Sequence, residues 1–176
     1  MSKLGSTLKR LGSALLLLPV YVLFMWSGHF NYLSIAVLST VVSAACLYEY
    51  YQITMGKGIK PFLKEGLAAT VIINIIVYLF AFGKILGTTN YVAEFDARWV
   101  LLIVALFLMF IMVRQIFTRQ IEGGIESLAV TVFGVIYIAV FFSHIILIRS
   151  LANGFYYLIM LHAIVMINDT FAYFGG

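Results

Sequence analysis

The chain has 176 residues, of which 64% are hydrophobic and only 10% are charged, with a net charge of +4. A water-soluble domain needs a charged surface, so this composition excludes one. Apolar runs near or above ~18 residues recur along the chain, which is typical of helices that cross a bilayer. We therefore predict an all-α polytopic membrane protein, with residues 1–176 forming a single helical domain.

The amino-terminal stretch "MSKLGSTLKRLGSALLLLPVYVLF" has a basic start and an apolar core, as a signal peptide does. No small-x-small cleavage site follows it before the next apolar run begins. We expect a retained first span, in which Pro19 introduces a kink that neighbouring helices accommodate.

Six apolar runs are candidate transmembrane helices. Their predicted bounds are 11–28, 30–51, 65–82, 99–113, 127–148 and 154–174. A membrane barrel would instead show alternating segments of ~10 residues. In the second run, Ala36, Ser39 and Ser43 recur at helical spacing, and small residues let helix backbones approach closely. We interpret this stripe as a packing face.

The distribution of basic residues predicts the orientation in the membrane. Cytoplasmic segments are enriched in Lys and Arg. With the amino terminus in the cytoplasm, eight of the 11 Lys and Arg residues fall on the inner side. These are Lys3, Lys9, Arg10, Lys57, Lys60, Lys64, Arg114 and Arg119. The sixth span then returns the end of the chain to the cytoplasmic side.

Asp169 follows the apolar run 155–167, separated from it by Asn168 alone. A charged side chain inside a bilayer is costly and normally faces a partner, a cavity or an ion. If the last helix begins at Gly154, fifteen residues place Asp169 ~22 Å along a hydrocarbon core ~30 Å thick. Asp169 is therefore our candidate functional carboxylate, with helix capping as the alternative. Glu49 is the second carboxylate in an apolar run, and its role stays open.

Two histidines also fall within apolar runs. His162 lies seven positions before Asp169, on nearly the same helix face but ~10 Å away along the axis. Direct contact between the two is therefore not expected. For His162 and His144 we predict hydrogen-bonded packing roles. The single cysteine, Cys46, excludes an intramolecular disulfide, and no zinc-type cluster or phosphate-binding loop is present in the sequence.

The segment "NDTFAYFGG", residues 168–176, resembles the D-[ST]-x-A-Y-x-x-G motif of the phosphatidate cytidylyltransferases, the CDP-diacylglycerol synthases. Its positions are occupied in order by Asp169, Thr170, Ala172, Tyr173 and Gly176. "LKRLGSALLLLPV" and "LYEYYQI" are similar to the first span and to the end of the second span in that family. The order and spacing of the three segments extend the resemblance over the whole chain.

The resemblance implies that CTP and phosphatidic acid react to CDP-diacylglycerol and pyrophosphate. It implies Asp169 as a catalytic residue and Mg²⁺ ligand, with Asn168, Thr170, Tyr173 and Gly176 binding substrate. The expected partners are CTP, phosphatidic acid, the lipid bilayer and a second copy in a homodimer, with no nucleic acid. The expected location is a bacterial inner membrane.

The chain departs from the family pattern after Gly176, where family members continue with further spans and more aspartates. We therefore expect an amino-terminal portion that holds one wall of the site. Two alternatives remain. One is a CTP-dependent polyprenol or phytol kinase, which phosphorylates an alcohol. The other is a non-catalytic assembly or transport subunit, in which Asp169 binds an ion or a proton.

Overall fold

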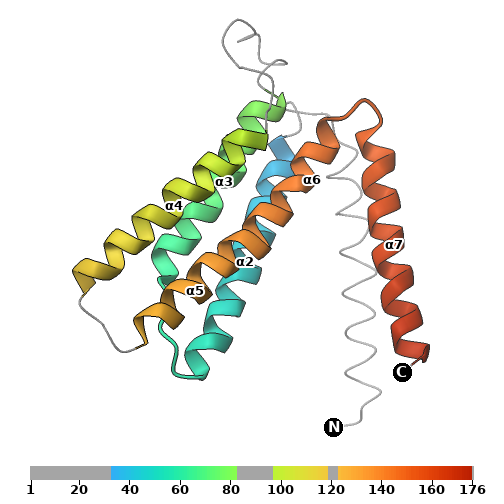
Figure 1. The fold of residues 1–176 in the computed structure, drawn as a ribbon. Helices are drawn as coiled ribbons and strands as arrows, with labels where there is room; N and C mark the ends of the chain where they lie inside the picture. The colour runs from blue at the N-terminus through green and yellow to red at the C-terminus, as the bar shows by residue number, and fades with distance from the viewer. Residues whose placement is uncertain (1–32, 83–96, 119–122, 176) are drawn as a thin grey trace, which may run out of the picture.

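The computed structural model describes residues 33–82, 97–118 and 123–175, and every element in these ranges is helical (Figure 1). The elements are α2 (Leu33–Gly56), α3 (Leu63–Phe82), α4 (Ala97–Thr118), α5 (Gly124–Gly134), the π-helix η3 (Val135–Val140), α6 (Phe141–Ser150) and α7 (Gly154–Gly175). In the described part of the chain, four helices are long and apolar enough to cross a bilayer. The prediction of an all-α polytopic membrane bundle is confirmed.

The last five predicted spans each correspond to helical structure. The second span extends to Gly56 instead of residue 51, and the fourth extends to Thr118 instead of 113. The fifth is a continuous rod of α5, η3 and α6 over Gly124–Ser150. The first span and Pro19 lie outside the described residues, so the count of six stays a prediction.

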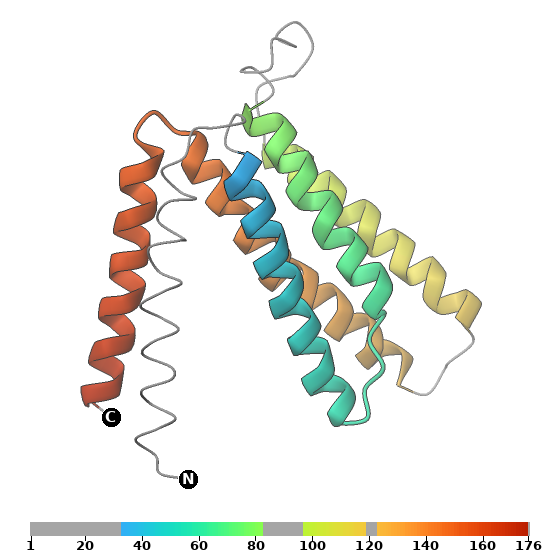
Figure 2. The same cartoon turned by 180° about the vertical axis from the view of Figure 1, so that it is seen from behind.

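The helices run alternately in opposite directions (Figures 1 and 2). Helices α2, α4 and α7 all finish at the same end of the bundle, and helices α3 and α5 begin at that end. We call this end the motif end, because α7 carries residues 168–175 to it. Helices α4 and α7 lie on opposite sides of the α2 and α5–α6 layer.

The core lies between α2, α3 and the α5–α6 rod. Tyr51, Val77 and Ala139 are among its fully buried members. The predicted packing face on α2 is confirmed, since Ala36, Ser39 and Ser43 are all buried. The Ser39 hydroxyl also donates to the Phe142 carbonyl at 3.0 Å, which joins α2 to α6.

Polar groups inside the bundle are mostly paired within it. The Tyr51 hydroxyl donates to the Thr131 carbonyl at 2.9 Å, and the Phe62 N–H donates to the Thr131 hydroxyl oxygen at 2.9 Å. The side-chain N–H₂ of Asn74 donates to the Ser43 hydroxyl oxygen of α2 at 3.3 Å and to the Thr70 carbonyl of its own helix at 2.9 Å. Because lipid offers no hydrogen bonds, such pairing keeps these helices together.

Among the described helices, α7 packs against the bundle through its first turns. Leu158 is fully buried against Ile35 of α2, with Ile145 and Phe155 packed around the pair. Beyond His162, every side chain described up to residue 172 is exposed. The second half of α7 therefore diverges from the other described helices (Figures 1 and 2).

Candidate functional site

Three of the predicted site residues lie together in the second half of α7, at the motif end. Asn168, Asp169 and Thr170 are all exposed. The Thr170 hydroxyl donates to the Met166 carbonyl of its own helix at 2.7 Å. Within the described residues the Asp169 carboxylate makes no ion pair, so it is open to an external ligand. The Tyr173 side chain and Gly176 lie outside the described part.

The other singled-out polar residues do not join this group. Glu49 is exposed on α2. His162 is half-buried, and its Nδ1 lies 2.7 Å from the Leu158 carbonyl. His144 is exposed, with Nδ1 2.8 Å from the Val140 carbonyl. A carbonyl only accepts, so Nδ1 is the donor in both rings. The hydrogen-bonded role is confirmed for both histidines, but His144 is not packed in the core.

The donor chemistry around Asp169 suits a hard cation. A carboxylate and the neighbouring Asn168 amide offer oxygen ligands, which Mg²⁺ prefers. In the described ranges, no three His, Cys, Asp or Glu side chains lie close enough together to hold a metal ion. Mg²⁺ sites in nucleotide-using proteins often need only one or two carboxylates, because substrate phosphates and waters complete the shell. The ligand chemistry at Asp169 is therefore compatible with binding a metal–nucleotide complex.

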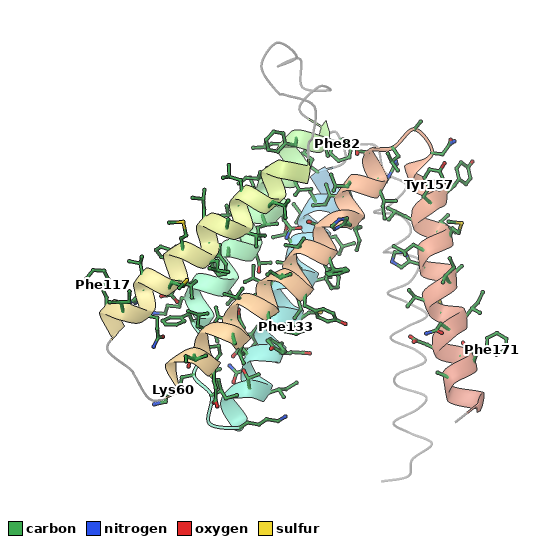
Figure 3. The ribbon with its side chains drawn as sticks, viewed as in Figure 1. Lys60, Phe82, Phe117, Phe133, Tyr157 and Phe171 are labelled. Carbon is green, nitrogen blue, oxygen red and sulfur yellow. The ribbon has the colours of Figure 1, made fainter. Side chains whose placement is uncertain are left out.

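Basic side chains gather at the motif end. Lys57 and Lys60 are exposed in the connection between α2 and α3, and Lys64 is exposed in the first turn of α3. Figure 3 shows Lys60 at the same end of the molecule as Phe171 of α7. Near this end, Arg114 of α4 pairs with Glu65 of α3 at 3.2 Å. A cationic surface of this kind raises the local concentration of polyanions such as nucleotides.

A groove of about 210 Å³ lies where α7 diverges from α2 and α6. We call it the α7 groove, and it is lined by Ile35, Leu38, Ser39, Val42, Phe142, Ile145 and His162. The sequence did not predict this groove. Its walls come from three helices that are far apart along the chain, and helical periodicity says which face is apolar but not which partner it meets.

A family model described as the cytidylyltransferase family matches residues 8–176. The match spans all the described helices and the motif at residues 168–176. No curated protein and no solved structure matches the chain. The similarity of the chain to known proteins therefore rests on this family match.

Proposed function

The chain belongs to the cytidylyltransferase family, and we propose that it is a phosphatidate cytidylyltransferase. A membrane-embedded member of this family is a CTP-using transferase. The observation that supports a lipid acceptor is the position of Asp169. It is an exposed carboxylate near the end of a helix apolar enough to span the bilayer. At that depth a water-soluble nucleotide and a lipid headgroup can both reach it.

The proposed reaction is a single displacement at phosphorus. An oxygen of the phosphatidic acid phosphate attacks the α-phosphorus of CTP, forming a P–O bond. The bond from the α-phosphorus to the bridging oxygen of the β-phosphate breaks, and pyrophosphate leaves with that electron pair. Catalysis of such transfers rests on positioning and on compensating the charge that develops on the phosphate oxygens.

We assign roles to the motif residues accordingly. Asp169 holds Mg²⁺, which when bound neutralises phosphate charge. Asn168 and Thr170 flank that carboxylate, and Asn168 orients the substrate phosphates through its side-chain N–H₂. Thr170 does so when its hydroxyl turns from the Met166 carbonyl to donate to a phosphate oxygen. Tyr173 and Gly176 contact substrate further along the motif. The exposed lysines at the motif end support this assignment, since they attract both the nucleotide and the anionic lipid.

We further propose that the motif end faces the cytoplasm of a bacterial cell, where CTP is available. The concentration of Lys57, Lys60 and Lys64 at this end supports the orientation, because cytoplasmic segments of membrane proteins are enriched in basic residues.

The fate of the CTP phosphates tests the reaction type. The full-length protein is incubated with Mg²⁺, with CTP labelled either at the α- or at the γ-phosphate, and with vesicles that contain phosphatidic acid together with polyprenol and phytol. A cytidylyltransferase transfers the α-label to the lipid and releases the γ-label as pyrophosphate. A kinase acting on polyprenol or phytol transfers the γ-label to the alcohol. Transfer of γ-label alone would contradict the proposal and support the kinase.

A further inference from the structure

We propose that the α7 groove holds an acyl chain of the lipid substrate. This inference rests on the proposed function, and it adds a binding subsite for the hydrophobic part of phosphatidic acid. The groove is bounded by Ile35, Leu38 and Val42 of α2, by Ile145 of α6 and by His162 of α7.

The chemistry of the groove lining fits hydrocarbon. Of the seven described residues that line it, five are apolar. The two polar ones bond to backbone carbonyls of the bundle: the Ser39 hydroxyl donates to Phe142, and His162 Nδ1 donates to Leu158. An acyl chain in the groove therefore leaves neither of these donors unpaired. The same chain gains free energy from each methylene group that it packs against the aliphatic wall.

The position of the groove along α7 fits a lipid that is anchored at Asp169. His162 precedes Asp169 by seven residues, which is two turns, so both lie on nearly the same face ~10 Å apart along the axis. A lipid whose phosphate lies beside Asp169 has its glycerol and esters one turn deeper. Its chains then continue along α7 and pass the groove at His162.

A second apolar groove provides a control. It lies between α3 and α4, has a volume of about 320 Å³, and includes Ile72, Ile76, Leu106 and Phe110 in its lining. Helix α4 lies on the opposite side of the bundle from α7 (Figures 1 and 2). A lipid anchored at Asp169 cannot place a chain there, although this groove is the larger of the two.

Filling each groove tests the subsite by kinetics. Val42→Phe narrows the α7 groove, and Ile72→Phe makes a matched change in the α3–α4 groove. For Val42→Phe we expect KM for dioleoyl phosphatidic acid to rise about fivefold, because the larger side chain removes packing contacts between several methylene groups and the groove wall. KM of Val42→Phe for dihexanoyl phosphatidic acid should stay within about twofold of the parental value. KM of Ile72→Phe should do the same for both lipids. An unchanged ratio of long-chain to short-chain KM in Val42→Phe would overturn the inference.

Photolabelling tests the subsite without catalysis. The full-length protein in phosphatidylcholine vesicles is irradiated with phosphatidic acid that carries a diazirine midway along one acyl chain. We expect the label on peptides from residues 33–42 and 142–148. This labelling should disappear when unlabelled phosphatidic acid competes and in the Val42→Phe variant. It should persist in the Ile72→Phe variant. Label that phosphatidic acid does not displace would overturn the inference. Competed label without nucleotide transfer would leave the subsite standing and contradict the proposed reaction.

Discussion

Tyr51 of α2 occupies the point where three helices meet. Its ring is fully buried, and its hydroxyl donates to the Thr131 carbonyl of α5. A Cβ placed on Gly66 of α3 would overlap the tyrosine side chain, and one on Gly134 would lie within 3.0 Å of the same ring. The two glycines thus allow α3 and α5 to approach a large aromatic side chain without a gap, and Tyr51 sets the spacing between the helices.

We predict that Gly66→Ala lowers the free energy of unfolding by about 1–3 kcal/mol, because the added methyl group displaces a buried ring with no free space around it. Thermal unfolding in detergent measures the effect. Gly56→Ala is the control, since a Cβ at Gly56 meets nothing within 4 Å. Equal melting temperatures for the two variants would contradict the role given to Tyr51.

At the residue scale, the sequence predicted features that depend on local spacing. The stripe of Ala36, Ser39 and Ser43 was recognisable because small residues recur on one helix face. The bond from Tyr51 to Thr131 was not, because the two residues are 80 positions apart. Nothing in the local pattern around either residue specifies the other as its partner.

The rod of α5, η3 and α6 was predicted as one regular span, and the structure adds a π turn at Val135–Val140. The buried positions of the rod include a series that recurs every fourth residue across the π turn. The series is Ser127, Thr131, Val135, Ala139 and Ser143. In an ideal α-helix, a step of four residues advances the face by about 40°, so this series would rotate out of the core. The wider π turn returns Ala139 and Ser143 to the side of α2 and α3.

We predict that deletion of the partly exposed Ile136 is tolerated. A π turn contains one residue more than an α turn, so removing one converts η3 to α-helix and keeps α6 in register. The cost should be about 1 kcal/mol or less, as for an ordinary surface change. The measurement is thermal unfolding combined with helical content by circular dichroism.

Deletion of the exposed Ala45 from α2, which has no π turn, is the matched control. It would rotate Leu47 and Tyr51 by ~100° out of the core and cost more than about 4 kcal/mol. A loss of folding with the Ile136 deletion as severe as with the Ala45 deletion would contradict this explanation of η3.

The whole molecule combines a packed bundle with one divergent helix. Membrane insertion, the motif and its place near a helix end were predictable, because hydropathy and residue order carry that information. The divergence of α7 and the groove that it creates were not, because they depend on which helix packs against Leu158. Relative to the other described helices, the motif residues are therefore presented on an exposed face of α7, while the buried core is formed by α2, α3 and α5–α6.

Membrane orientation is a prediction at this scale. The Cys46→Ser variant removes the single cysteine and serves as the background. In it, Lys60→Cys marks the motif end and Asn153→Cys marks the opposite end. Both positions are exposed. A membrane-impermeant maleimide applied to intact cells or spheroplasts should label Asn153→Cys at once and Lys60→Cys only after permeabilisation. The reverse pattern would place the motif end outside and contradict the proposed access to CTP.

The most direct test of the central claim measures how fast the full-length protein transfers the α-phosphate of CTP to phosphatidic acid with Mg²⁺ present. The rate is compared among the parent protein, Asp169→Asn and Glu126→Gln. Glu126 is an exposed carboxylate in the first turn of α5, at the same end of the bundle. We predict a loss of about 100-fold or more for Asp169→Asn, since the carboxylate that would hold the charge-compensating Mg²⁺ is removed, and a near-parental rate for Glu126→Gln. A parental rate in Asp169→Asn would contradict the assignment of Asp169 as the catalytic carboxylate.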